Sequence, residues 1–74
     1  MTRPDRLIQM ANQIGKFFVT QPGDGAAGVA DHIRDFWDPQ MRGEILAWCA
    51  AGGEGLDPIA KDAVGRLAAK TPAR

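Results

Sequence analysis

Cys49 is the only cysteine and His32 the only histidine in this 74-residue sequence, and this scarcity limits how so short a chain can be held in one fold. A chain of this length buries only about 60% of its unfolded surface, so its own core leaves a thin margin of stability. Small proteins usually gain the remainder from disulfides, a metal ion or a partner. One cysteine cannot form an internal disulfide, and a structural zinc or iron–sulfur site needs about four Cys or His ligands. We therefore expect a larger protein partner, and no cofactor or metal in this chain by itself.

The charge balance and the apolar pattern argue against several other classes of partner. Nine Lys and Arg residues balance nine Asp and Glu residues, so the chain lacks the positive patch typical of nucleic-acid-binding proteins. No apolar stretch approaches the ~20 residues that a membrane-spanning helix needs. The N-terminal residues alternate charged and apolar side chains and form no signal-peptide core. With a single unpaired cysteine, these features favour a cytoplasmic protein that binds neither nucleic acid nor membrane.

Helix start and stop signals divide the chain into four helical segments. An Asp-Pro pair occurs twice, and each pair can supply a capping Asp followed by a Pro at the first helical position. A Gly-Gly pair ends the third segment, and no segment alternates as a strand would. We predict an all-α bundle of about four helices in one domain spanning residues 1–70, with residues 71–74 as a frayed tail. The expected helices run from about Pro4 (with Thr2 as a cap) to Val19, Ala26 to Trp37, Pro39 (capped by Asp38) to Ala51, and Pro58 (capped by Asp57) to Lys70.

The first helix carries a wider apolar face than a small bundle obviously needs. At about 100° per residue its apolar side chains fill an arc of roughly 200°, about twice the stripe of an ordinary surface helix. Either this helix is central and the other three contact it on two sides, or one edge of the arc, at Met10 and Phe17, faces a partner. Gly15 lies inside the arc and would let another backbone approach closely. The sequence leaves open whether that backbone is internal.

The remaining helices divide into an aromatic group and an alanine-rich one. All five aromatic residues lie on the first three segments, with Phe36 in the apolar arc of the second, so these three segments are expected to carry the core. The face of the fourth segment is built largely from alanine. We expect that helix to pack loosely or to dock elsewhere.

The titratable residues offer little for catalysis. His32 has Asp31 and Asp35 nearby, but an i,i+3 pair is ordinary helix-surface geometry. We therefore expect His32 to hydrogen-bond locally or to a partner. Cys49 lies on an apolar face, where a small core residue is favoured over a nucleophile. Arg34 is either a solvated charge or a forked donor to a partner, as is Arg42 on the other side of the turn.

Two stretches together resemble a known family. The segment MANQIGKFF (residues 10–18) is followed after a short loop by GVADHIRDFWDPQMR (residues 28–42). In this order they are similar to the delta subunit of NAD-dependent, molybdenum-containing formate dehydrogenase. The resemblance covers roughly Leu7 to Cys49, and the C-terminal third is not distinctive.

The resemblance implies a non-catalytic accessory subunit of a soluble complex that converts formate and NAD to carbon dioxide and NADH. Molybdopterin, iron–sulfur clusters, FMN and NAD would then lie in the larger partner subunits, and the molybdenum-bearing subunit is the expected docking partner. An assembly or cofactor-insertion factor and a free-standing helical interaction module remain as alternatives. No catalytic residue is transferred to this chain. The candidate partner contacts are Met10, Asn12, Gln13, Phe17, His32, Arg34, Trp37 and Arg42.

Overall fold

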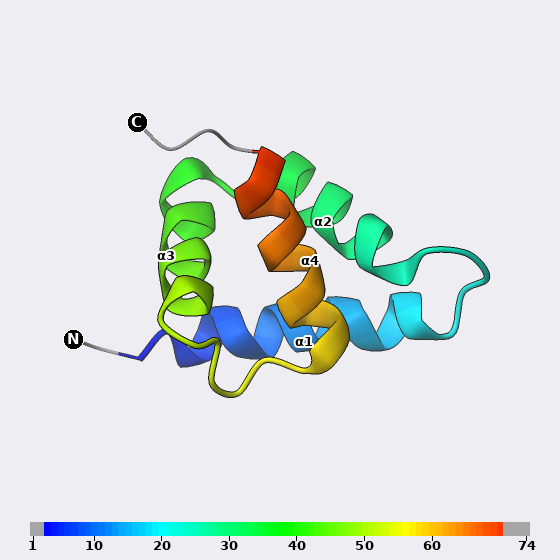
Figure 1. The fold of residues 1–74 in the computed structure, drawn as a ribbon, viewed down its shortest axis with the longest axis horizontal. Coiled ribbons are helices and arrows are strands. Elements are labelled where there is room, and N and C mark those ends of the chain that lie inside the picture. Colours follow the sequence, from blue (N-terminus) through cyan, green and yellow to red (C-terminus); the bar gives the residue numbers. More distant parts are fainter. Residues whose placement is uncertain (1–2, 71–74) are drawn as a thin grey trace.

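A computed structural model describes residues 3–70 and contains four helices. They follow the predicted order, and each begins and ends within about one residue of the expected position (Figure 1). No strand occurs between residues 3 and 70, so the all-α prediction is confirmed. The cap at Thr2 and the tail at residues 71–74 lie outside the described residues. The helices are α1 (Asp5–Val19), α2 (Gly25–Phe36), α3 (Pro39–Ala50) and α4 (Pro58–Lys70).

The caps of α2 and α3 fix where these helices begin and end. The side chain of Asp38 accepts a hydrogen bond from the Met41 amide at 2.8 Å, so the predicted cap of α3 is confirmed. Gly52 and Gly53 follow the C-terminus of α3 with φ angles of 126° and 65°. Residues other than glycine rarely adopt such backbone angles, so this glycine pair lets the chain turn after α3 with little backbone strain. The structure adds a cap that the sequence analysis missed, at Asp24 before α2.

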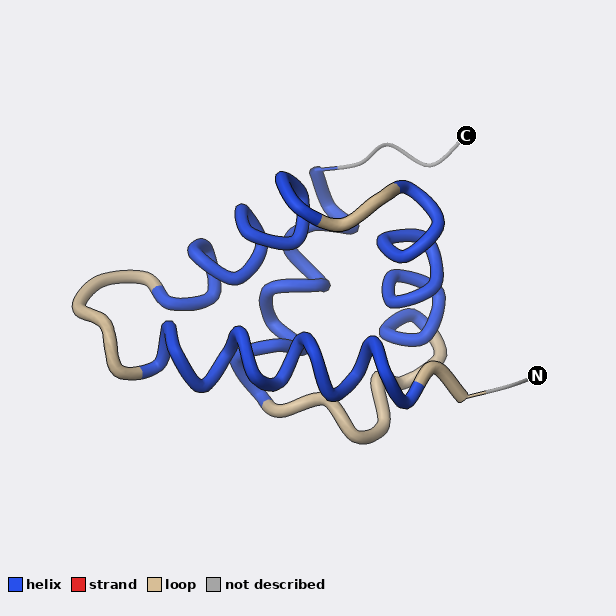
Figure 2. Tube along the Cα trace, turned by 180° about the vertical axis from the view of Figure 1, so that it is seen from behind, coloured by secondary structure: helices blue, strands red, loops and turns tan. Residues whose placement is uncertain are grey.

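Three helices form a layer, and the fourth lies on one side of it. Viewed from the front and from behind, α1, α2 and α3 make the sides of a triangle, and α4 crosses only the front (Figures 1 and 2). α1 and α2 converge at the loop that joins them and diverge toward the C-terminus of α2. α1 contacts all three other helices, and so does α4, which does so more extensively; α1 is therefore packed on more than one side but is not the single central helix.

The fourth helix belongs to the core, so the expectation of a loosely packed appendage is wrong. Ala60, Ala63 and Val64 are fully buried, and α2 and α4 share the most extensive helix–helix contact within residues 3–70. The alanine face, interpreted from the sequence as weak, allows the helix axes to approach closely. This close approach of α4 also identifies the element that packs against Gly15 of α1. A Cβ added there would lie 2.8 Å from Cγ2 of Ile59 on α4, so the approaching element is internal.

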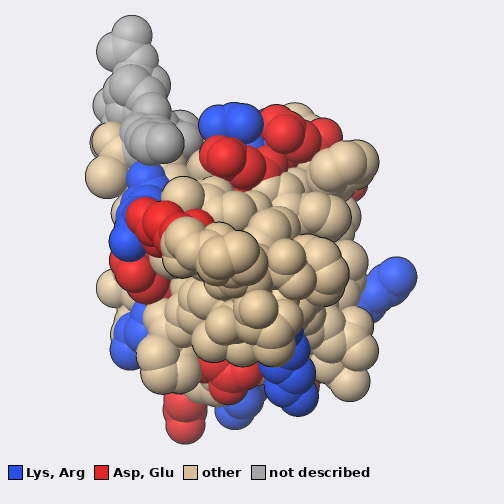
Figure 3. All heavy atoms as spheres, turned by 90° about the vertical axis from the view of Figure 1, so that its right-hand side faces the viewer, with Lys and Arg blue, Asp and Glu red and all other residues tan. Residues whose placement is uncertain are grey.

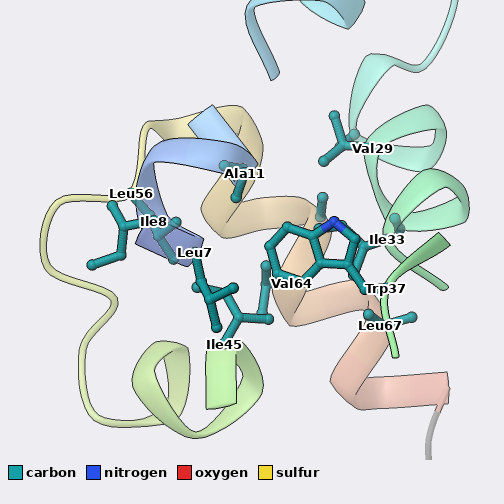
Figure 4. Packing of buried hydrophobic residues seen from close by; sticks show 14 residues of the cluster. Leu7, Ile8, Ala11, Val29, Ile33, Trp37, Ile45, Leu56, Val64 and Leu67 are labelled. Atoms are coloured by element: carbon teal, nitrogen blue, oxygen red, sulfur yellow. The ribbon is translucent and has the colours of Figure 1, made fainter. Parts of the chain in front are cut away.

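The aromatic residues do not all enter the core. Trp37 is 4% exposed and packs in the same cluster as Ile33, Val64 and Leu67 (Figure 4). In contrast, Phe36 is 75% exposed, although its helical position predicted burial. Phe36 lies on the last turn of α2, where α1 has diverged and no longer covers it. The backbone turns to an extended conformation at the next residue, and this turn directs Trp37 inward.

Candidate functional site

Exposed and half-buried aromatic side chains lie at the C-terminal end of α1 and along α2. The Phe17 ring meets the Phe18 ring edge-on, with centroids 5.1 Å apart. Phe18 lies so close over Gly28 that an added Cβ would be 2.5 Å from its ring. One and two turns further along α2, the rings of His32 and Phe36 lie against each other with centroids 4.7 Å apart and their planes tilted by 33°. We call Phe17, Phe18, His32 and Phe36 the aromatic face.

The exposed ring of Phe17 lies against an anchored one. Phe17 is 60% exposed, yet its neighbour Phe18 is anchored against Gly28 of α2. The Thr20 hydroxyl donates to the Phe17 carbonyl at 2.8 Å and fastens the end of the helix. A large apolar side chain that packs against an anchored neighbour has less conformational entropy to lose when a partner covers it. Aromatic residues of this kind are enriched among the residues that dominate binding energies.

The end of the molecule next to Phe17 is poor in charge. The segment FFVTQPG (residues 17–23) contains no charged residue. At this end uncharged atoms fill the middle of the surface, and charged side chains lie around the edge (Figure 3). Asp24 is paired with Arg66 of α4 through a 2.5 Å contact, and this hydrogen bond, with one from the Ala27 amide, lowers the pKa of Asp24 below its ordinary value of 3.8. A partner surface could cover the Phe17 side of this end and desolvate few unpaired charges.

The two carboxylates beside His32, those of Asp31 and Asp35, form ion pairs with Arg34. Its guanidinium bonds Asp35 at 3.1 Å and Asp31 at 3.2 Å, and these two carboxylates raise the pKa of Arg34 above its ordinary value. Neither acid orients the imidazole. His32 is half-buried and lies against Phe36, an arrangement that suits a residue at the rim of an interface and lacks the oriented base of a catalytic pair.

Asn12 connects α1 to the loop before α4. Its Nδ2 donates to the Gly55 carbonyl at 2.9 Å, and its Oδ1 accepts from the Asp57 amide at 2.8 Å. The second bond fixes Asp57 at the N-cap position of α4, and the carbonyl of Asp57 accepts from the Lys61 amide. Both ends of the Asn12 amide are therefore used within the chain. Asn12 was predicted to contact a partner, and its bonds to two backbone groups of the same chain were not foreseen.

Arg42 and Trp37 also have internal roles. Nη1 of Arg42 donates to the carbonyls of Arg34 and Trp37 at 2.9 and 3.0 Å, so it satisfies acceptors at the C-terminus of α2. Arg42 was predicted to be a solvated charge or a donor to a partner, and these two bonds are instead made within this chain. The Trp37 ring lies in the core, where a partner could reach it only after repacking. Among the eight candidate residues, Met10 is half-buried, and Gln13 and Phe17 are exposed.

A shallow hollow lies on the other side of α1. It has a volume of about 290 Å³ and is lined by Gly15, Lys16, Val19, Asp57, Pro58 and Ile59. One amine and one carboxylate at the rim of an apolar hollow do not make a catalytic set. Between residues 3 and 70, no three His, Cys, Asp or Glu side chains are placed to hold a metal ion. No helix in that range is long and apolar enough to cross a membrane.

Sequence analysis missed two features of this surface. Phe36 was assigned to the core because helical periodicity cannot show where a neighbouring helix diverges. The Asp24–Arg66 pair joins residues 42 positions apart, although Asp24 before a glycine-rich helix start was itself a capping signal.

Comparison with known proteins identifies the family. Residues 6–64 match the family model of the NADH-dependent formate dehydrogenase delta subunit. The chain belongs to this family. The match extends beyond the two motifs noted in the sequence and includes the start of α4. Neither a curated protein nor a solved structure gives a significant match to the chain. Membership of a delta-subunit family implies larger companion subunits in a formate dehydrogenase complex.

Proposed function

We propose that this delta subunit is a non-catalytic accessory subunit that docks on a larger subunit of formate dehydrogenase through its aromatic face and stabilises the assembly. The observation that carries the proposal is the 60% exposed Phe17 ring, packed edge-on against Phe18 at an uncharged end of the molecule. Large exposed apolar side chains that adjoin one another mark interaction surfaces. The molybdenum-bearing subunit is the partner we propose. Molybdopterin, iron–sulfur clusters, FMN and NAD would lie in the companion subunits.

Co-purification tests this proposal directly. The delta subunit is co-expressed with affinity-tagged larger subunits, and its stoichiometry in the purified active complex is measured. We expect stoichiometric retention of the wild-type chain. Phe17→Ala should weaken binding about 30-fold, the effect of losing about 2 kcal/mol at a central contact. Because Phe17 is already exposed, the isolated variant should keep its helicity.

A matched control separates docking from general surface changes. Val19 is 64% exposed on the same last turn of α1, but it borders the hollow on the other side of the helix. Val19→Ala should bind within about twofold of wild type. An active, intact complex that never contains the delta subunit would refute docking as a resident subunit. If deletion then lowered the molybdenum content of the enzyme, the chain would instead be an assembly factor.

A further inference from the structure

A second pattern on α1 specifies the kind of element that docks there. Arg6, Met10, Gln13 and Phe17 are spaced by four, three and four residues, which is the spacing of a coiled-coil seam. Arg6, Gln13 and Phe17 are exposed, and Met10 is half-buried. We call these four residues the outer stripe of α1. At ~1.5 Å per residue the stripe is about 16 Å long, or three turns of a facing helix.

The outer stripe points away from α4. Gly15 marks the side of α1 that contacts α4, since an added Cβ would meet Ile59. At about 100° per residue, all four stripe residues lie roughly 140–180° from Gly15 around the helix. Because α4 crosses only the front of the layer formed by the other helices (Figures 1 and 2), it leaves Arg6, Gln13 and Phe17 exposed, while Met10 is half-buried against the core at the edge of the stripe.

The charge at the N-terminal end of the stripe lacks a counterpart within the described chain. Between residues 3 and 70, no ion pair involves Arg6. The one acidic residue on α1, Asp5, is bonded to Arg3 at 2.7 Å. Arg34 on α2, by contrast, has two carboxylate partners. Arg6 is therefore a cation available to a partner's carboxylate.

We propose that the outer stripe of α1 binds one helix of the larger subunit, which places apolar side chains against Met10 and Phe17 and a carboxylate against Arg6. This inference rests on the proposed docking function and names the element that docks. Alternating apolar and polar seam positions fix the register of a helix pair. The polar positions, Arg6 and Gln13, would thus set the register against the partner.

A second copy of the chain does not satisfy this pattern. A parallel pair would place Arg6 against Arg6, and an antiparallel pair would place it against Phe17. Neither arrangement supplies a carboxylate. The apolar area is also small for a dimer, because one aromatic side chain covers only about 150–250 Å² and a stable interface buries about 800 Å² on each partner. The stripe therefore fits as one part of a larger contact with a larger subunit.

Charge reversal at two positions of α1 tests the inference. Arg6→Glu reverses the charge on the stripe, and Lys16→Glu makes the same change beside the hollow on another side of the helix. Binding of each variant to the purified larger subunits is measured by titration. Arg6→Glu should weaken binding at least tenfold, whereas Lys16→Glu should stay within about twofold. An acidic residue in the first turn of a helix is favourable and one in the last turn is not, so impaired folding would affect the control more strongly.

The possible results separate this inference from the docking proposal. If wild type binds and both variants bind equally well, the stripe does not meet a carboxylate and the inference is overturned, while docking stands. If wild type does not bind, docking itself fails, and the inference fails with it. A photo-crosslinking residue at position 13 supplies a second readout. It should label a helical, acid-containing segment of the larger subunit, and labelling of a segment without an acidic residue would overturn the inference.

Discussion

Replacing Asn12 by alanine should destabilise the isolated domain substantially, because this side chain joins α1 to the loop before α4. Two hydrogen bonds are lost, to the Gly55 carbonyl and from the Asp57 amide. Each bond contributes about 0.5–1.5 kcal/mol, and a half-buried amide left without a partner adds to the cost. We expect the free energy of unfolding to fall by about 2 kcal/mol. In a domain of this size that corresponds to a decrease in Tm of roughly 8–16 °C.

Urea unfolding followed by tryptophan fluorescence and far-UV circular dichroism measures this change. The adjacent Gln13 is a suitable control, since it is an exposed amide on the same helix. Gln13→Ala should alter stability by less than about 0.5 kcal/mol. Asn12→Asp keeps the oxygen that accepts from the Asp57 amide and loses the donor to the Gly55 carbonyl. Its stability should therefore lie between those of Asn12→Ala and Gln13→Ala. A stability of Asn12→Ala equal to that of the control would refute the internal role and favour a partner contact.

The remaining predictions concern glycine packing and acid stability. Gly28→Ala should lower the free energy of unfolding, measured in denaturant melts, by about 1–3 kcal/mol, because its Cβ would lie 2.5 Å from the Phe18 ring. Gly43→Ala, at a helical site with open space around it, should raise the free energy of unfolding by about 0.5–1 kcal/mol. Equal effects of the two substitutions would contradict the packing of Phe18 on Gly28. Because the pKa of Asp24 is lowered in the folded state, chiefly by Arg66, this carboxylate stabilises the fold above its unfolded pKa, and the contribution is lost as pH falls through the lower folded value. Carboxyl NMR titration of Arg66→Ala should therefore show the pKa of Asp24 moving up toward 3.8, and an unchanged value would remove the pair as its cause.

Parts of the candidate surface could be predicted from sequence, and parts could not. The wide apolar arc of α1 directed attention to Met10 and Phe17, and the structure leaves Phe17 exposed. Whether they contact a partner stays a prediction. Asn12 and Arg42 were also selected, but their hydrogen bonds are made to segments of the same chain. A polar residue that is tied internally and one that awaits a partner look alike in sequence. The distinction depends on which backbone carbonyls fold against the side chain.

The sequence by itself determined the helices, because their signals are local. Asp-Pro pairs, glycine pairs and apolar spacing act over one or two turns, and they placed the helix ends to within about one residue. The family was also readable from two continuous motifs. Burial was decided only by the tertiary structure, since it depends on which helices approach one another. Close packing drew the alanine face of α4 into the core, and divergence of α1 from α2 left Phe36 in solvent. The surface that this protein offers to a larger subunit is therefore a property of helix arrangement, which no single helix encodes.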